Sequence, residues 1–363
     1  MQHRLILAAA FGLLAVPGFA QDNKTVHIYN WSDYIADDTV KQFEAATGYE
    51  VVYDVYDSNE VLEAKLLAGN SGYDVVVPTS SFLQRQVKAG VYQELDKSKL
   101  PNLKNMDPAL MQAAAAYDPD NAHSVIYMWG TTGIGYNEEK VKERLGDDAP
   151  TDSWALVFDP QYAEKLADCG VTMLDSQTDM LQSALAYLGL DPKSTSADDM
   201  EKAAEAIQKV RPYIRYFHSS QYISDLANGE VCVSVGFSGD VFIAADRAEQ
   251  ANNGVTISYT VPKEGAQQWF DLMAIPADAP NPDGALAWIN FIMEPQVTAD
   301  ITNYVWYANA NTASMPFVDD DIKNDPAIFP PAEVLAKLFP AVVYDAKLDR
   351  VMTRLWTKVQ TGQ

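Results

Sequence analysis

The stretch EVVYDVYDSNEVLEAKLLAGNSGYDVVVPTSSFLQRQVKAG (residues 50–90) decides the fold class. Its Val- and Tyr-rich segments 50–56 and 73–77 have the composition of β-strands. Each is followed by a helical segment, 59–68 and then 81–89, and a glycine ends each helix. Alternating strands and helices imply parallel strands joined by right-handed crossovers, so the sequence predicts an α/β fold.

The same alternation extends along the chain in both directions. We expect further strands at 26–30, 170–174 and 231–237, extended runs at 255–261, 270–275 and 304–309, and helices at 39–47, 180–188, 197–210, 241–250, 284–293 and near the C-terminus. This pattern predicts two α/β lobes, with the apolar, Gly-rich segment YMWGTTGIGYN (127–137) crossing between them. We expect residues 21–130 and 252–305 to form lobe 1, and residues 131–251 and 306–363 to form lobe 2.

The first twenty residues have the pattern of a secretory signal peptide. Arg4 precedes an apolar run at 5–16, Pro17 and Gly18 break the run, and small residues stand before Gln21. The run is too short to span a membrane, and no later segment has ~18 uninterrupted apolar residues, so we expect no membrane insertion. We therefore predict cleavage near Ala20–Gln21 and export to the periplasm; a buried N-terminal helix is the alternative.

Cys169 and Cys232 are the only two cysteines of the chain. Export would place them in an oxidising compartment, where a disulfide is favoured over a thiol or metal role. The alternative is a pair of buried free thiols.

The charge balance limits the class of partner. The chain has 26 basic against 50 acidic residues, for a net charge of −24. This argues against nucleic acid and against adsorption to anionic lipid, because both need Lys and Arg. It weakly favours a cationic partner.

Acidic and aromatic residues gather where predicted strands end. In open α/β sheets, ligands bind beyond the carboxyl ends of the strands. The clusters are WSDY (31–34), TS (79–80), DSQTD (175–179), FSGD (237–240), WFD (269–271) and WY (306–307). Rings attract cations and cover methylene groups, and carboxylates accept charge-assisted hydrogen bonds. The combination suits a ligand with an apolar middle and ammonium ends, although Asp179 and Asp240 would each also fit as simple helix caps.

The chain lacks the motifs of common cofactor, metal and hydrolase sites. His27, His123 and His218 are widely separated, and no H-x-x-x-H, C-x-x-C or G-x-S-x-G pattern occurs. Gly130, Gly133 and Gly135 match neither a phosphate-binding nor a dinucleotide-binding loop. We expect no cofactor, no metal and no enzymatic activity, while paired carboxylates leave an amine- or sugar-processing enzyme as a remote alternative.

Several stretches together resemble one protein family. They are VHIYNWSDYI (26–35), YDVYDSNEVLEAKLLAGNSGYDVVVPTSSFL (53–83), YMWGTTGIGYN (127–137), YFHSSQYISDLANGE (216–230), GFSGDVF (236–242) and QWFDLMAIP (268–276). In these the chain resembles the periplasmic putrescine/spermidine-binding proteins of bacterial polyamine ABC transporters. The resemblance covers essentially the whole chain after the signal segment. It implies a type II periplasmic-binding fold, whose two lobes close over a polyamine in the cleft between them.

The resemblance also implies a set of ligand-binding residues. Aromatic rings flank the ligand's methylene chain, polar side chains contact it beside them, and carboxylates bind its ammonium groups. The implied residues are Trp31, Ser32, Asp33, Tyr34, Thr79, Asp179, Phe237, Asp240, Trp269, Asp271 and Tyr307. Thr79, Asp179 and Phe237 replace the Ser, Glu and Trp of relatives, and the cysteines match a disulfide pair seen in relatives.

The resemblance further implies a monomeric receptor that delivers its ligand to the permease subunits of an inner-membrane ABC importer. Relatives that prefer spermidine have Trp at the position of Trp269, where some putrescine binders have Phe. Because the clusters also hold carboxylates for more than two ammonium groups, we predict spermidine in preference to putrescine. A receptor for another small solute is the alternative; amino-acid receptors usually hold an Arg for the α-carboxylate, and the clusters contain none.

Overall fold

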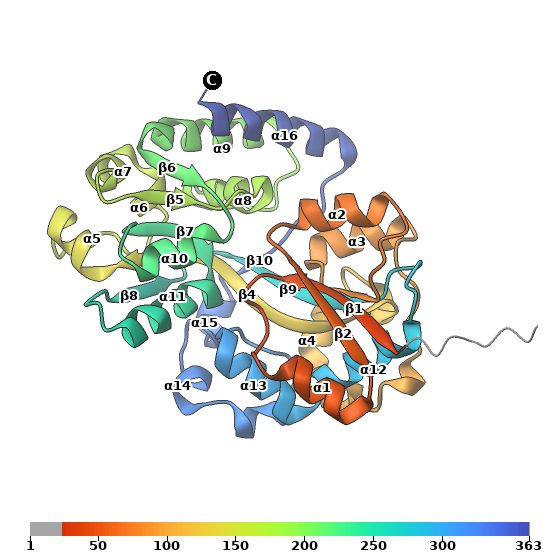
Figure 1. Ribbon diagram of the computed structural model, residues 1–363. Helices are drawn as coiled ribbons and strands as arrows, with labels where there is room; N and C mark the ends of the chain where they lie inside the picture. The colour runs from red at the N-terminus through yellow and green to blue at the C-terminus, as the bar shows by residue number, and fades with distance from the viewer. Residues whose placement is uncertain (1–23, 363) are drawn as a thin grey trace, which may run out of the picture.

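A computed structural model of the protein describes residues 24–362 (Figure 1). The predicted signal peptide, residues 1–20, lies outside the described residues. The strands are β1 (Thr25–Trp31), β2 (Glu50–Tyr56), β3 (Val75–Val76), β4 (Ser124–Asn137), β5 (Val171–Met173), β6 (Ile214–Phe217), β7 (Val233–Phe237), β8 (Ile257–Thr260), β9 (Gln267–Ala274) and β10 (Phe339–Pro340).

Helices make up most of the rest of the described chain. The α-helices are α1 (Thr39–Thr47), α2 (Asn59–Leu67), α3 (Ser80–Lys88), α4 (Pro108–Ala114), α5 (Glu138–Leu145), α6 (Ala155–Phe158), α7 (Pro160–Leu166), α8 (Gln177–Tyr187), α9 (Ala197–Val210), α10 (Gln221–Ala227), α11 (Ser238–Ala251), α12 (Pro282–Ile292), α13 (Pro295–Val305), α14 (Asp320–Lys323), α15 (Ala332–Leu335) and α16 (Ala346–Thr361). Short 3₁₀ helices lie at Lys97–Lys99, Pro101–Asn105, Pro119–Asn121, Arg211–Tyr213 and Thr312–Phe317. No helix within residues 24–362 is long and apolar enough to cross a membrane.

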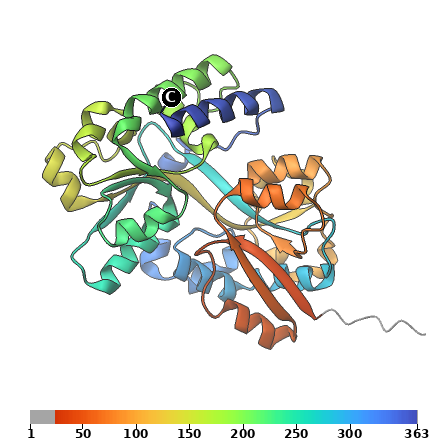
Figure 2. The same cartoon turned by 45° about the horizontal axis from the view of Figure 1, so that its top comes forward.

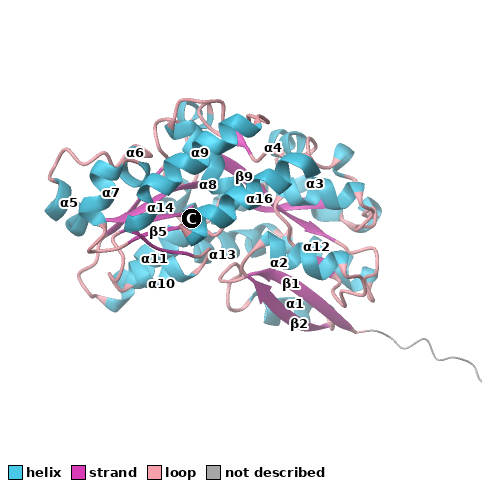
Figure 3. Cartoon of the chain, turned by 90° about the horizontal axis from the view of Figure 1, so that it is seen from above, coloured by secondary structure: helices cyan, strands magenta, loops and turns pink. Residues whose placement is uncertain are grey.

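The strands form one connected sheet in the order β2-β1-β3-β9-β4-β7-β5-β6, with β10 beside β9 and β8 beside β4. The first half contains the parallel trio β2, β1 and β3, and the second half the parallel trio β7, β5 and β6. Helices flank the strands in both halves (Figure 3). The predicted α/β class is therefore confirmed, and the two parallel groups correspond to the two lobes.

Strand β4 holds the two halves together. Residues 124–131 pair with β9, and residues 132–137 pair with β7 and β8. The predicted crossing segment 127–137 lies within this strand, and in Figure 2 the yellow strand β4 and the cyan strand β9 run through the middle of the molecule. All but one of its residues are buried, as expected for a strand covered on both faces.

Gly133 of β4 allows close packing against the neighbouring strand. A Cβ atom on Gly133 would come within 2.4 Å of the Thr260 carbonyl oxygen and 2.5 Å of the Tyr259 hydroxyl. Only a residue without a side chain lets the neighbouring strand approach this closely.

Several element boundaries differ from the sequence prediction. Strand β3 contains only Val75–Val76. On one side of it, the Asp74 carboxylate accepts hydrogen bonds from the backbone N–H groups of His27 and Asn281. On the other side Pro78 follows, and proline has no N–H group to donate to a neighbouring strand. Helix α3 begins at Ser80, one residue earlier than predicted. Of the predicted extended tract 304–309, the start belongs to helix α13, and Trp306 caps that helix in a left-handed conformation with φ 59°.

The exact lobe boundaries stay a prediction. The pairing of β8 with residues 134–137 favours grouping residues 257–260 with the second half of the sheet. The isolated bridges from Ala308 to Trp129 and from Asn311 to Met106 favour grouping these late residues with the first half.

The predicted disulfide is present. Cys169 and Cys232 are bonded, both are buried, and their Cα atoms are 5.5 Å apart. The bond ties the loop after α7 to the segment that leads into β7, across a sequence separation of 63 residues.

We expect the double variant Cys169→Ala/Cys232→Ala to lose about 4 kcal/mol of unfolding free energy, because the bond restricts a long loop of the unfolded chain. Urea denaturation of the variant and of the wild type measures the difference. The reduced wild type is the matched control and should resemble the variant. Equal stability of the oxidised wild type and the variant would contradict the expectation.

Candidate ligand-binding site

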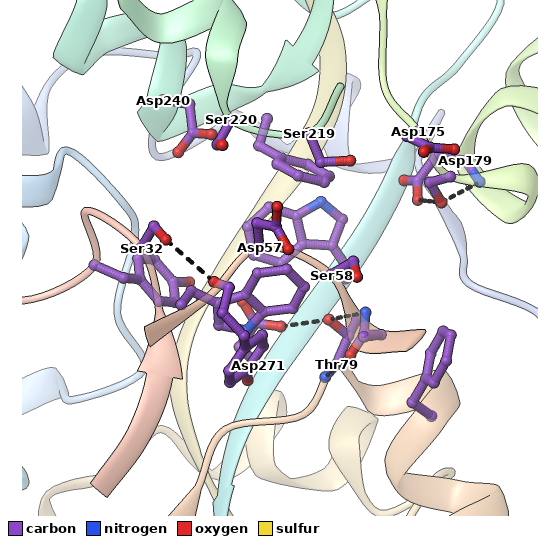
Figure 4. Close-up of a pocket in the computed structure, with 18 of the residues that line it drawn as sticks. Ser32, Asp57, Ser58, Thr79, Asp175, Asp179, Ser219, Ser220, Asp240 and Asp271 are labelled. Carbon is purple, nitrogen blue, oxygen red and sulfur yellow. Dashed lines mark hydrogen bonds between the residues drawn. The ribbon is translucent and has the colours of Figure 1, made fainter. Parts of the chain in front are cut away.

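A cleft lies where the two halves of the sheet face each other. Its walls come from the segment after β1, the loop between β2 and α2, the start of α3, the starts of α8 and α11, and strand β9. In Figure 4, Asp240 lies on one side of the drawn residues, Asp175 and Asp179 lie on the other, and Asp271 lies beneath. Among residues 24–362, none of those that line the cleft is a Lys, Arg or His.

The cleft brings together ten of the eleven predicted site residues: Trp31, Ser32, Tyr34, Thr79, Asp179, Phe237, Asp240, Trp269, Asp271 and Tyr307. Asp33 is the exception. Its carboxylate lies 2.6 Å from the Arg247 guanidinium of α11, and both side chains are 41% exposed. The backbone of Asp33 has a left-handed conformation, with a φ of 53°.

Asp271 projects from β9 into the cleft and is held by its neighbours. Thr79 donates its hydroxyl to the Asp271 carboxylate at 2.7 Å, and Asn59 fixes Thr79 through two hydrogen bonds of 3.0 Å. Asp271 is only 4% exposed. Burial raises the pKa of Asp271 to about 7; the hydrogen bond from Thr79 opposes this effect, and the charges of Asp179 and Asp240 add to it.

Asp240 faces the cleft from the first turn of α11. Tyr222 and Tyr307 each donate a hydroxyl to one of its carboxylate oxygens at 2.6 Å. Burial raises the pKa of Asp240 to about 6, although both tyrosines stabilise the ionised form. The helix-cap interpretation fails here, because Phe237 occupies the N-cap and both Asp240 oxygens are bound by tyrosines.

Asp179 lies in the first turn of α8, on the side of the cleft opposite Asp240 (Figure 4). Its carboxylate accepts hydrogen bonds from Ser176 at 2.6 Å, Thr132 at 2.7 Å and Gln267 at 3.0 Å. Ser176, and not Asp179, is the N-cap of α8. Burial raises the pKa of Asp179, while the bonds from Ser176 and Thr132 lower it.

Four aromatic residues of the cleft, Phe237, Trp269, Tyr307 and Tyr34, form one connected group of rings. Trp269 packs edge-on against Phe237 with ring centroids 5.7 Å apart, and against Tyr307 at 5.6 Å. Tyr307 in turn meets Tyr34 at 4.9 Å. Trp31 is held by its indole N–H, which donates to the Val77 carbonyl at 2.9 Å. A ligand in the cleft therefore meets ring faces and edges between the carboxylates.

The cleft also contains residues outside the eleven implied ligand contacts, although three of them belong to the predicted DSQTD cluster at 175–179. They are Tyr56, Asp57, Ser58, Asn59, Glu60, Ser81, Phe82, Asp175, Ser176, Thr178, Ser219, Ser220, Ile223 and Gln267. Residues 57–60 directly follow strand β2, so the rule about strand ends would have found them. Gln267 shares a face of β9 with Trp269 and Asp271, because side chains alternate along a strand. Ile223 and the serines of the 219–220 loop lie in the stretch 216–230 that carries the family resemblance, but no acidic–aromatic cluster marks them as contacts.

We expect Asp271→Asn to stabilise the ligand-free protein at pH 8 by a few kcal/mol. The folded state holds the carboxyl proton up to about pH 7, whereas an unfolded Asp releases it near pH 4. Ionised Asp271 therefore costs stability, and this cost grows as the pH rises from about 4 to 7. The amide introduced by Asp271→Asn keeps an acceptor for the Thr79 hydroxyl without the charge.

Urea denaturation at pH 4 and pH 8 measures this effect. The gain should be small at pH 4, and the exposed Asp321→Asn should show no comparable gain at either pH. A stability difference between Asp271→Asn and wild type that does not change with pH would contradict the expectation.

Comparison with known proteins places this fold and cleft in a family. Residues 38–330 match the family model for bacterial extracellular solute-binding proteins. The chain is 56% identical to the putrescine-binding periplasmic protein SpuD of Pseudomonas aeruginosa, over 96% of both chains. It is 55% identical to the putrescine-binding periplasmic protein PotF of Escherichia coli, over 99% of this chain and 97% of the relative.

A solved structure agrees with these matches. The putative spermidine/putrescine ABC transporter protein from Listeria monocytogenes superposes with a TM-score of 0.84 at 29% identity, over 94% of this chain and all of that chain. These relatives are transport proteins and not enzymes. The chain belongs to the family of bacterial extracellular solute-binding proteins and, within it, to the polyamine-binding proteins of ABC transporters.

Proposed function

We propose that this protein is a periplasmic receptor that encloses a linear polyamine between its lobes and delivers it to the permease of an ABC importer. The observation that carries the proposal is the charge of the cleft. Three buried carboxylates, Asp179, Asp240 and Asp271, line one cleft, and the described part of the chain places no basic side chain in its lining. The names of the relatives support the same ligand class and the same compartment.

The buried carboxylates explain why a polyamine fits better than other solutes. An ionised carboxylate without a cationic partner is unfavourable in a buried site, and the raised pKa values of Asp240 and Asp271 express this cost. Ammonium groups supply the missing charge, and rings such as Trp269 cover the methylene groups between them. An amino-acid ligand would bring a carboxylate of its own and would find no Arg in this lining.

The magnitudes are sufficient for tight binding. Charge-assisted hydrogen bonds contribute about 1.5–3 kcal/mol each, and cation–π contacts about 0.5–2 kcal/mol each. Micromolar binding needs only about 8 kcal/mol net. Ordering of a flexible ligand and closure of the lobes consume the difference.

The individual ligand contacts remain proposals. We propose that Trp31, Tyr34, Phe237, Trp269 and Tyr307 cover the methylene chain. The polar contacts are Ser32, Asp33, Thr79, Asp179, Asp240 and Asp271. For Asp33 this role requires release from Arg247, because the two are paired in the structure.

We further propose that spermidine binds more tightly than putrescine, and that the receptor acts as a monomer. Trp269 gives a broad face, and carboxylates on both sides of the cleft provide for more than two ammonium groups. The competing candidate is putrescine, which the names of the relatives at 55–56% identity favour.

Titration calorimetry with both ligands tests this order of affinities. We expect spermidine to bind the wild type at least tenfold more tightly than putrescine. In Trp269→Phe this ratio should fall, because the smaller ring covers less of a longer ligand. Tighter binding of putrescine by the wild type would contradict the spermidine preference, while binding of neither amine would overturn the proposed function.

Binding should also depend on pH. Ammonium groups pair with ionised carboxylates, and in the free protein Asp240 and Asp271 take up protons below about pH 6 and 7. We therefore expect affinity to rise from pH 5 to pH 8, with protons released to the buffer on binding near pH 6.5. Calorimetry in two buffers of different ionisation enthalpy measures the proton release. A pH-independent affinity would show that these carboxyls do not contact the ligand.

A further inference from the structure

Helix α16 has a buried face and a solvent-facing face. Leu348, Met352, Trp356 and Val359 are buried, and the helix packs against α9 and α8. Figure 1 shows α16 on the outside of the molecule, alongside α9. The inner face of α16 thus makes the packing contacts that hold this helix on the protein.

The outer face carries a row of basic side chains. Lys347, Arg350, Arg354 and Lys358 are all exposed, and we call these four residues the basic face. At 3.6 residues per turn they fall within an arc of about 80° on one side of the helix. Asp349 lies on a different side and accepts a hydrogen bond from Gln177 at 3.1 Å.

The basic face is not neutralised by nearby acids. Within residues 24–362, none of the four side chains lies within 4.0 Å of a carboxylate oxygen. The pKa of Asp345 is lowered mainly by the hydrogen bond from the backbone N–H of Leu348. The charges of Lys347 and Arg350 lower it further. Four bases in a row, none of them in an ion pair among the described residues, stand out in a chain of net charge −24.

The helix that carries the basic face is hydrogen-bonded to a residue that lines the cleft. Asp175, which lines the cleft, accepts hydrogen bonds from the Trp356 indole at 3.0 Å and from Gln360 at 2.6 Å, both in α16. Trp356 and Gln360 project from the other side of the helix, so a partner on the basic face would contact the helix that holds Asp175 without lying next to the cleft itself.

We propose that the basic face docks onto an acidic surface of the transmembrane permease subunits, on their periplasmic side. The inference rests on the proposed function, since it assumes delivery to a permease. Charge complementarity of this kind steers association and fixes orientation. Anionic lipid fits less well, because the other exposed residues of the helix are Ala346 and threonines, which offer no large apolar group for insertion, and the net charge opposes adsorption.

The test compares binding of the wild type and of K347Q/R350Q/R354Q/K358Q to the cognate permease complex in phosphatidylcholine nanodiscs. We expect the variant to bind about tenfold or more weakly at about 50 mM salt, and the difference to shrink at about 300 mM, where exposed charges are screened. Polyamine affinity in calorimetry should be unchanged, because none of the four residues lines the cleft.

Two matched variants separate local charge from net charge. K24Q/K41Q/K88Q/K104Q changes the same number of exposed basic residues in the first part of the chain and should retain wild-type docking. K347R/R350K/R354K/K358R keeps the charge of the basic face and should also retain it. Equal losses in the two glutamine variants, or no loss in either, would overturn the proposal.

Vesicles of phosphatidylglycerol without permease test the lipid alternative. If the wild type sediments with them and K347Q/R350Q/R354Q/K358Q does not, lipid is the occupant and the permease proposal is wrong. The outcomes stay distinct from those of the proposed function. If the wild type binds polyamine but the basic-face variant docks as well as the wild type, only this inference is wrong. If the wild type binds no polyamine, the proposed receptor function is wrong.

Discussion

Strand β4 is the constraint on which the rest of the structure depends. Its first residues pair with β9 and its last residues pair with β7 and β8, so one buried strand belongs to both halves of the sheet. Because the halves share this strand, side chains from segments far apart in the sequence face one cleft. Gly133 matters for the same reason, since any side chain there would collide with the neighbouring strand.

The buried carboxylates of the cleft lower the stability of the free protein and are already oriented to bind a cationic ligand. Asp240 and Asp271 are buried, and each is held in place by hydroxyl donors before any ligand arrives. These donors orient the carboxylates but do not neutralise them, so the empty site retains an unfavourable charge that a cationic ligand relieves. The same side chains therefore weaken the free protein and favour the bound one.

The sequence predicted the α/β class, the disulfide and ten residues of the cleft, because strand ends, cysteines and aromatic–acid clusters are local signals. It did not predict that Asp33 pairs with Arg247, since that contact joins residues 214 positions apart. Nor did local pattern reveal that Tyr222 donates to Asp240, because a tyrosine in a short helix carries no sign of what it faces. The sequence predicted a longer strand at 73–77 than the observed β3. The Asp74 carboxylate accepts hydrogen bonds from the backbone N–H groups of His27 and Asn281 at the edge of this strand.

The absence of Lys, Arg and His from the lining of the cleft has a further consequence. With no internal counter-ion, the empty cleft is a region of negative potential that attracts any small cation in the surrounding fluid. We therefore expect inorganic cations at high concentration to weaken the binding of a cationic ligand. The ionic strength of the surrounding solution thus becomes part of the effective affinity.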